Sequence, residues 1–299
     1  ICLDYANEKA KTWASRRGFP IEDNMGNYPR LWEHKIADAD IVLCHFWDHP
    51  MLDELFCDPI PDCRLVFWCH KHYEVPPAVL AYPDLFINTS PIQGHGRYIW
   101  STGDMSRFFN LQPVCHEGFN IGYCGTVNYT KLHRDFIRMC NSIRIPEVKF
   151  TVVGEMNLPD YKDELQMSGK FRFVGQVDDV APYLAEMDIF FYPLKRNNYS
   201  TCEQSLGEAM ACRIIPVVLD NPAEKLIIEH HKSGLVAYDE LELVRHIEYL
   251  YNNPKKREIM SMNAQNRAKL LYNINEMIAS WNNIFEEVMR MPKKTRGVI

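Results

Sequence analysis

The sequence is most informative from Phe173 to Val218, which reads F-V-G-Q-V (173–177), then M-D-I-F-F-Y-P (187–193), then S-L-G-E-A-M-A-C-R-I-I-P-V-V (205–218). Apolar runs of strand length alternate here with a segment of helical length, as in a parallel sheet covered by helices. A helix is expected to begin near Glu203, after a strand and the polar loop Lys195–Thr201. Its amino end then lies at the carboxyl edge of the sheet, where free N–H groups and the helix dipole favour a phosphate.

The same alternation extends over most of the chain. Apolar runs of strand length recur at Ile41–Cys44, Leu65–Trp68, Leu85–Ile87, Ile121–Cys124, Lys149–Val153, Phe171–Val174, Ile189–Tyr192 and Ile215–Leu219. Segments of helical length lie between several of them, at Lys131–Ser142, 161–166, Val180–Met187 and Ser205–Ala211. Strands that alternate with helices predict parallel sheets covered on both faces.

Glycine and proline interrupt this pattern between Pro91 and Phe119, so a domain boundary is predicted near residue 117. After Gly234 the chain is expected to be helical, with apolar residues at three- and four-residue spacing in Leu241–Tyr251, Lys255–Leu271 and Glu276–Met289. One apolar stripe in the last helix consists of Ile278, Trp281, Ile284, Phe285 and Val288. The stripe predicts that this helix covers an apolar surface.

Composition limits the class of protein. The 299 residues are 46% hydrophobic and 24% charged, which suits two globular domains. A net charge of -6 without a basic stripe argues against a nucleic-acid partner, and no apolar run has the length of a transmembrane helix. Ten cysteines without C-x-x-C spacing favour a reducing, cytoplasmic setting. The chain opens on Ile1 without a signal-like leader, so we interpret its start as an incomplete boundary and not as a signal peptide.

The string from Leu206 to Val218 resembles the L-E-A-M-A-x-G-x-P-V-V signature of the family 4 retaining glycosyltransferases. Further matches follow the family's order: I-G-Y-C-G-T-V-N-Y-T-K (121–131), F-T-V-V-G-E (150–155), F-V-G-Q-V (173–177), D-I-F-F-Y-P (188–193) and S-G-L-V (233–236). The resemblance implies the GT-B fold, two facing Rossmann-like domains. Residues 1–117 then form the acceptor-side domain, which is short for this family, 118–275 the nucleotide-sugar-binding domain, and 276–299 a helix that returns to the N-terminal domain.

The resemblance also implies site residues. Glu208 binds the ribose hydroxyls, and Lys131, which follows Gly125 and its turn, contacts the diphosphate. The turn that holds Gln176 and Val177 binds the base. The loop before the helix offers backbone N–H groups from Cys202, Glu203, Gln204, Ser205 and Leu206. The role of Lys131 agrees with the chemistry, because a lysine and a helix terminus stabilise a diphosphate that gains charge as it leaves.

Three departures from the family pattern stand out. Ser200 occupies the position of a second glutamate, and Thr126 that of an arginine near the phosphate lysine. Cys202, Glu203 and Gln204 replace a glycine-rich loop. These changes affect the donor sugar more than the ribose and phosphates, so the identity of the sugar is not predicted.

Three histidines follow the first strands: His45 after one, His70 and His72 after the next. Parallel strands end at one edge of a sheet, where ligands bind in open α/β folds. In the family a histidine placed like His70 lies by the donor sugar, so His70 is expected to join Lys131 among the catalytic residues. A metal site at His70 and His72 stays open as an alternative, but no carboxylate with ligand spacing joins them, and no metal ligand is predicted.

The sequence therefore predicts a retaining glycosyltransferase of the hexosyltransferase type, acting in polysaccharide or glycoconjugate synthesis. A UDP- or GDP-sugar is the expected donor and a carbohydrate or lipid-linked hydroxyl the acceptor, with no cofactor. The location is predicted to be cytoplasmic, with peripheral contact at the inner face of a membrane left open. Two alternatives remain: a non-catalytic nucleotide-sugar-binding partner subunit of the same fold, and a sugar-nucleotide epimerase.

Overall fold

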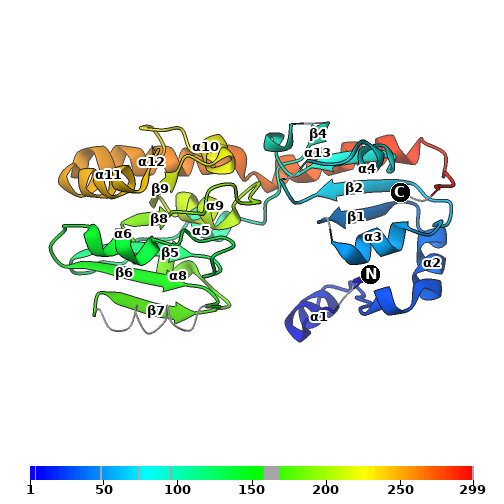
Figure 1. The fold of residues 1–299 in the computed structure, drawn as a ribbon, viewed down its shortest axis with the longest axis horizontal. Coiled ribbons are helices and arrows are strands. Elements are labelled where there is room, and N and C mark those ends of the chain that lie inside the picture. The colour runs from blue at the N-terminus through cyan, green and yellow to red at the C-terminus, as the bar shows by residue number, and fades with distance from the viewer. Residues whose placement is uncertain (4, 48, 73, 95, 158–168, 298–299) are drawn as a thin grey trace. The chain divides into compact units, whose positions relative to one another are not determined.

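The computed structural model describes residues 1–299 except 4, 48, 73, 95, 158–168 and 298–299. The chain divides into two compact units (Figure 1): the first contains Ile1–Ile99 and Ile278–Ile299, and the second contains Trp100–Met277. The sequence-based boundary near residue 117 differs from this division, because Met105 and Phe108 are buried in the core of the second unit. Residues 100–117 therefore belong to the second unit.

The first unit contains a parallel sheet of four strands in the order β1-β2-β3-β4. The strands are β1 Val42–Phe46, β2 Leu65–Cys69, β3 Leu85–Asn88 and β4 Arg97–Tyr98. The helices are α1 Glu8–Ser15, α2 Pro29–Asp38, α3 Pro50–Phe56 and α4 Pro77–Ala81, with 3-10 turns at Met25–Asn27 and Pro91–Gln93. Every residue of β2 is buried, as expected for an apolar run inside a parallel sheet.

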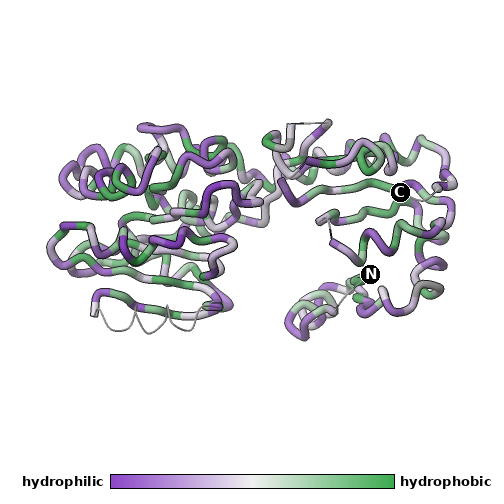
Figure 2. Tube along the Cα trace, in the orientation of Figure 1, coloured by the Kyte–Doolittle hydropathy of each residue, from purple (hydrophilic) through white to green (hydrophobic). Residues whose placement is uncertain are grey.

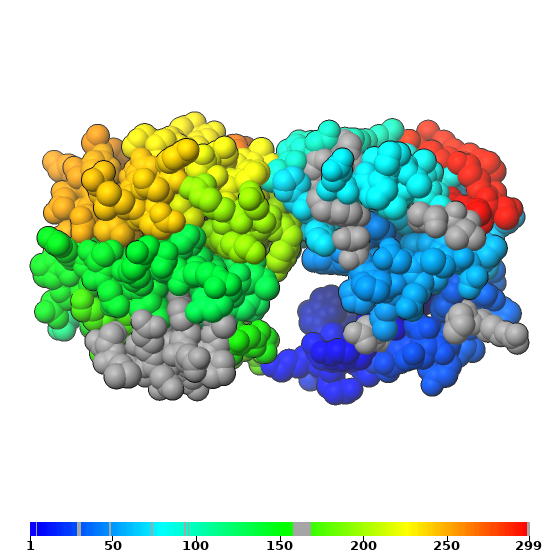
Figure 3. Space-filling model, in the orientation of Figure 1, coloured from blue at the N-terminus to red at the C-terminus, as the bar shows by residue number. Residues whose placement is uncertain are grey.

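The C-terminal segment packs on the first unit, as the family resemblance implied. Helix α13, Ile274–Met289, places the ring of Trp281 against that of Trp68, with centroids 5.1 Å apart. Beyond it Arg296 forms a buried ion pair with Asp84, and the red C-terminal atoms lie against this unit in Figure 3. The stripe is only partly buried, because the side chain of Ile278 is exposed.

The second unit contains a parallel sheet of six strands in the order β10-β9-β8-β5-β6-β7. They are β5 Phe119–Cys124, β6 Val148–Val153, β7 Phe171–Gly175, β8 Ile189–Tyr192, β9 Ile215–Leu219 and β10 Leu235–Ala237. The helices are α5 Ser106–Phe109, α6 Phe136–Ser142, α8 Ala181–Leu184, α9 Gln204–Ala211, α10 Pro222–Ile227, α11 Glu240–Asn252 and α12 Pro254–Leu271. The chain runs from β5 to β6 and β7 on one side, then returns to β8 on the other side of β5.

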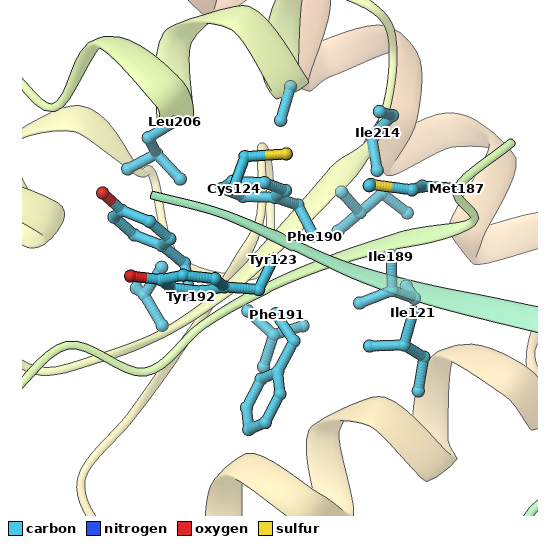
Figure 4. Packing of buried hydrophobic residues seen from close by; sticks show 14 of the residues in the cluster. Ile121, Tyr123, Cys124, Met187, Ile189, Phe190, Phe191, Tyr192, Leu206 and Ile214 are labelled. Carbon is cyan, nitrogen blue, oxygen red and sulfur yellow. The ribbon is translucent and has the colours of Figure 1, made fainter. Parts of the chain in front are cut away.

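Burial of the apolar strands holds this unit together. Its central strands are green and the outer faces of its helices largely purple in Figure 2. Figure 4 shows the phenol rings of Tyr123 and Tyr192 side by side in this core, with both hydroxyl groups on the same side. Their ring centroids are 5.5 Å apart. Two neighbouring strands, β5 and β8, thus bring polar phenol ends to the carboxyl edge of the sheet.

The predicted fold class, α/β with two parallel-sheet domains, is confirmed. Strands β4 and β10 were not predicted, because both are too short to stand out as apolar runs. The helix expected at 161–166 lies outside the described residues. No helix among the residues that the structure describes is long and apolar enough to cross a bilayer.

Candidate donor site at the carboxyl edge of the second sheet

The loops after β5 and β8 meet at the point where the order of the strands reverses. Leu132 and Leu194 form an antiparallel bridge, and the N–H of Lys195 donates a hydrogen bond of 2.7 Å to the carbonyl oxygen of Lys131. The N–H of His133 donates one of 3.0 Å to the carbonyl of Pro193. In open α/β sheets, ligands bind beyond the carboxyl ends of the strands at such a switch point. The two loops are therefore the first place to look for a ligand site.

Lys131 lies in the first of these loops, not at the start of a helix as its sequence context suggested. The next helix, α6, begins only at Phe136. The side chain of Asn128 accepts hydrogen bonds from the N–H groups of Thr130, at 3.2 Å, and Lys131, at 3.1 Å. Asparagine commonly forms such turns in place of helix. The turn holds the backbone of Lys131 beside the loop that follows β8.

The ammonium group of Lys131 lies against the carboxylate of Glu203. Nζ is 3.1 Å from Oε2, and the side chains are 19% and 7% exposed respectively. The hydroxyl of Tyr192 donates a hydrogen bond to the same oxygen. Only the backbone of Glu203 was expected at the site. Its carboxylate was not assigned, although a glutamate in place of a family glycine was visible in the sequence.

Helix α9 begins directly after Glu203, as predicted. The N–H of Leu206 is hydrogen-bonded to the carbonyl oxygen of Glu203 at 3.1 Å. The N–H groups of Gln204 and Ser205, the first two residues of α9, have no acceptor inside the helix. The side chains of Cys202 and Leu206 are buried, and the amide of Gln204 lies 3.7 Å from the sulfur of Met105. Free N–H donors at a helix amino end are typical of anion sites.

Glu208 follows one turn into α9 and is half-buried. Burial raises the pKa of its carboxyl to about 7; Arg107 opposes this rise and Asp179 adds to it. Arg107 and Asp179 form an ion pair of 3.0 Å, and neither residue was predicted at the site. Asp179 lies shortly after Val177 in the chain, so Glu208 is close to the loop predicted to bind the base. A half-buried carboxylate beside such a loop is suited to accept hydrogen bonds from hydroxyl groups.

Backbone hydrogen bonds that involve glycine residues join the carboxyl ends of β5, β6 and β7. The N–H of Gly125 bonds to the carbonyl of Val153, and that of Gly154 to the carbonyl of Gly175, each at 2.9 Å. A Cβ atom on Gly154 would lie 1.9 Å from the carbonyl oxygen of Gly125, so only glycine fits there. Gln176 follows as an exposed residue and Val177 as a half-buried one. The structure thus places the predicted phosphate and base loops along one edge of one sheet.

His70 belongs to the first unit, at the carboxyl end of β2. Its Nε2 lies 3.0 Å from Nδ1 of His45, and its ring stacks on Trp47 with centroids 4.8 Å apart. Burial, then the neighbouring His45, lowers the pKa of His70 to about 4. The imidazole is therefore neutral near pH 7 and suited to hydrogen bonding rather than to charge stabilisation. In the described part of the chain, no group of three or more His, Cys, Asp or Glu side chains is arranged to hold a metal ion.

The first unit also contains a cavity of about 470 Å³, which His45 of this pair lines. Its lining is mainly apolar and includes Trp32, Val42, Leu52 and Leu55, with His45 and Trp47 among its polar and aromatic members. Pockets of this kind, apolar with few polar groups, commonly bind small ligands.

Comparison with known proteins adds a family-model match over part of the chain and a similarity of fold. Residues 118–253 match the family model described as "Glycosyl transferases group 1". No curated protein matches the chain by sequence. The matched segment begins at β5 and ends after α11, so it contains Lys131, Glu203 and Glu208, whereas Arg107 lies before it.

Three solved structures are similar to the chain over most of its length. The Anabaena protein Alr3699/HepE in complex with UDP-glucose is 16% identical in sequence, and the alignment covers 94% of this chain and 90% of that protein, with a TM-score of 0.73. A glycosyltransferase from Rickettsia africae is 12% identical, and the alignment covers 95% of this chain and 89% of that protein, with a TM-score of 0.77. The sucrose-phosphate synthase of Thermosynechococcus elongatus is 15% identical, and the alignment covers 96% of this chain and 81% of that protein, with a TM-score of 0.72. The chain thus has the GT-B fold of these proteins.

Proposed function

We propose that this chain, whose residues 118–253 match the model of glycosyl transferases group 1, is a retaining glycosyltransferase that moves a hexosyl group from a UDP- or GDP-sugar to an acceptor hydroxyl. One observation carries the proposal. At the switch point of the second sheet, the ammonium of Lys131 lies by the start of α9, whose first N–H groups have no acceptor inside the helix, and Glu208 lies one turn further on. A cation and the N–H groups of a helix terminus are suited to bind the diphosphate of a nucleotide. A carboxylate is suited to bind its ribose hydroxyls.

The reaction breaks the bond between the anomeric carbon and the β-phosphate oxygen, and that electron pair leaves with the diphosphate. The acceptor oxygen bonds to the same face of the carbon, and its proton passes to the departing phosphate oxygen. The products are the glycosylated acceptor and UDP or GDP. Because the negative charge on the diphosphate increases in the transition state, Lys131 and the N–H groups of Gln204 and Ser205 accelerate the step more than they stabilise the bound donor. In this proposal no metal or other cofactor is required.

The cavity of the first unit belongs to the acceptor side of the proposal, and His70 stays a prediction for a polar contact with the donor sugar. A neutral imidazole at the end of β2 is suited to a hydrogen bond with a sugar hydroxyl. An apolar cavity of about 470 Å³ suits an acceptor that carries an apolar portion, which favours a lipid-linked acceptor over a free sugar. The reaction then takes place where the lipid is presented, on the cytoplasmic side of a membrane.

The partner-subunit alternative also has an observation in its favour. Glu203 neutralises the lysine that is expected to meet the diphosphate, and Ser200 replaces the glutamate that the family resemblance leads one to expect. A protein that binds the nucleotide without turning it over is compatible with both features.

One experiment separates these functions. The protein is incubated with a panel of nucleotide sugars, starting with UDP-glucose because the Anabaena protein of this fold was solved with it, and free UDP or GDP is measured. Slow release of nucleotide supports a transferase, and binding without release supports a partner subunit. Conversion of the sugar with the nucleotide intact points to an epimerase. Absence of binding to every donor contradicts all three.

A further inference from the structure

The cation of the candidate donor site already has an anionic partner in the protein. Nζ of Lys131 and Oε2 of Glu203 are 3.1 Å apart and largely shielded from water. At this separation and exposure the two charges cancel most of each other's field. A diphosphate that arrives at Lys131 therefore meets a neutral ion pair instead of a free ammonium group.

The carboxylate of Glu203 is held firmly in this position. The hydroxyl of the buried Tyr192 donates a hydrogen bond to Oε2, the oxygen that also faces Lys131. The hydroxyl of Tyr272 lies 2.7 Å and 3.1 Å from the carbonyl oxygens of Cys202 and Glu203, which fixes the backbone on either side of the Glu203 N–H. The pair is thus a built contact and not a chance meeting of two long surface side chains.

The backbone at Glu203 is also unusual for a residue with a side chain. Its φ of 24° lies in the left-handed region, which glycine adopts far more readily. A glutamate there is strained, and strain of this kind collects at functional sites. The side chain that the strained backbone carries is the one that occupies the lysine.

We infer that Glu203 competes with the donor diphosphate for Lys131 and so sets the affinity of the site for nucleotides. The inference rests on the proposed function. While the diphosphate is bound, Lys131 is shared with it or passes to it. When the nucleotide product leaves, the carboxylate takes the lysine back, which speeds release. Glu203 is in this view a residue that determines affinity, not one that touches the reacting carbon.

The competing explanation is purely structural: Glu203 holds Lys131 in the orientation that suits the phosphate. The two explanations differ in the sign of one measurement. If Glu203 competes, Glu203→Gln frees the ammonium and the enzyme binds UDP about tenfold more tightly. If Glu203 only positions the lysine, the same change weakens UDP binding or leaves it unaltered.

The test measures UDP and GDP affinity by isothermal calorimetry for the wild type and three variants. Glu203→Gln keeps the size of the side chain and is expected to tighten binding about tenfold. Glu203→Asp keeps the charge and is expected to stay within about threefold of the wild type. Glu186→Gln removes a carboxylate from a 2.8 Å pair with Arg172, just before β8 and so at the opposite edge of the sheet, and should leave affinity unchanged.

A second readout is inhibition by the product. The inhibition constant of UDP against the donor should fall about tenfold in Glu203→Gln, and UDP should raise the melting temperature of this variant more than that of the wild type. If Glu203→Gln does not fold, Glu203→Gly serves instead, because glycine suits the backbone and also removes the carboxylate.

The outcomes separate this inference from the proposed function. If the wild type binds UDP or GDP and neither Glu203→Gln nor Glu203→Gly binds more tightly, competition is wrong although the site stands. If Glu186→Gln tightens binding as much as Glu203→Gln, the effect is one of overall charge and the inference is overturned. If no form of the protein binds either nucleotide, the proposed function fails together with it.

Discussion

The hydroxyl of Tyr272 donates a hydrogen bond of 2.7 Å to the carbonyl oxygen of Cys202, which joins the end of α12 to the loop before α9. The ring of Tyr272 also packs on Gly207, where a Cβ atom would lie 2.5 Å from it. One buried phenol thus fixes both the entry to α9 and its first turn. The start of α9, which we propose to bind a phosphate, is thus held in place by a residue at the end of a helix far along the chain.

Replacing Tyr272 by Phe is expected to lower the free energy of unfolding by about 1 to 3 kcal/mol, because the buried carbonyl of Cys202 loses the hydroxyl donor and that of Glu203 loses one of its donors. UDP affinity should also fall, since the start of α9 becomes less ordered. Urea unfolding and calorimetry measure the two effects. Tyr199→Phe is the control, because Tyr199 is 45% exposed, and equal losses in both variants would contradict the role given to Tyr272.

The raised pKa of the Glu208 carboxyl predicts that nucleotide affinity depends on pH. Burial raises the pKa of its carboxyl to about 7, so the charged form, which we propose accepts hydrogen bonds from ribose, is lost as pH falls through 7. UDP affinity should therefore rise from pH 6 to pH 8 in the wild type. UDP itself titrates in this range, so the readout is the ratio of the wild-type constant to that of Glu208→Gln. A ratio that does not change with pH would remove Glu208 from the ribose site.

Loss of the carboxylate at Glu208 should weaken binding at every pH above 7. Glu208→Ala removes a charged acceptor, at a cost of about 1.5 to 3 kcal/mol, or about ten- to a hundredfold in affinity. The fold should remain intact, as checked by circular dichroism. Wild-type UDP and GDP affinity in this variant would contradict the assignment.

The raised pKa of the buried Glu224 carboxyl predicts that the stability of the protein depends on pH. Its carboxyl is fully buried, hydrogen-bonded to Asn221, and its pKa is raised to about 7, chiefly by burial. A folded-state pKa above the unfolded value of 4.5 gives stability that is complete below pH 4.5 and is lost as pH rises through 7. The loss amounts to about 3 kcal/mol. Glu224→Gln should therefore gain stability over the wild type between pH 5 and pH 8 in urea titrations, and a constant difference would refute this.

Much of the fold was readable from the sequence because its strands are buried on both faces. Ile189–Tyr192 and Ile215–Leu219 appear in the structure with the predicted bounds, since continuous apolar runs are what parallel sheets require. Two-residue and three-residue strands carry no such signal. The helix predicted from Lys131 begins later than expected. Before α6 the side chain of Asn128 accepts backbone hydrogen bonds and so forms a turn in place of the first helical turn.

The candidate site was readable only in part. Motif spacing places Lys131 and Glu208 on the loop after β5 and on α9, and the topology brings these elements to one edge. The ion pair of Lys131 with Glu203 depends on contact between loops after two strands that are distant in sequence but adjacent in the sheet. No local pattern encodes such a contact. The same holds for Arg107, which reaches the surroundings of Glu208 from α5.

Activity is expected to survive EDTA. The positive charge offered to the diphosphate comes from Lys131 and the start of α9 in the proposed mechanism, and the sequence has no D-x-D pair near the site. Donor turnover is measured with and without EDTA, followed by addition of Mn²⁺ or Mg²⁺. Loss of turnover with recovery on adding Mn²⁺ would overturn a mechanism that relies on protein cations alone.

Lys131 gives the sharpest prediction about catalysis. Lys131→Ala should lower kcat by about 10²-fold or more, the scale of losing one preorganised group that stabilises developing charge. The Michaelis constant for the donor should rise less than kcat falls, because the attraction is stronger in the transition state than in the bound donor. Steady-state kinetics with a saturating acceptor separate the two constants.

The ion pair changes the stability expected for this variant. Lys131 is not a free surface lysine, so Lys131→Ala leaves the shielded carboxylate of Glu203 without its cation and should lower the free energy of unfolding by about 1 to 3 kcal/mol. The double variant Lys131→Ala/Glu203→Gln removes that uncompensated charge and should regain most of this stability. Its kcat should stay low, because the cation that meets the leaving group is still missing. A double variant that recovers kcat together with stability would show that Lys131 acts through folding, and wild-type kcat in the single variant would end its assignment to the reaction.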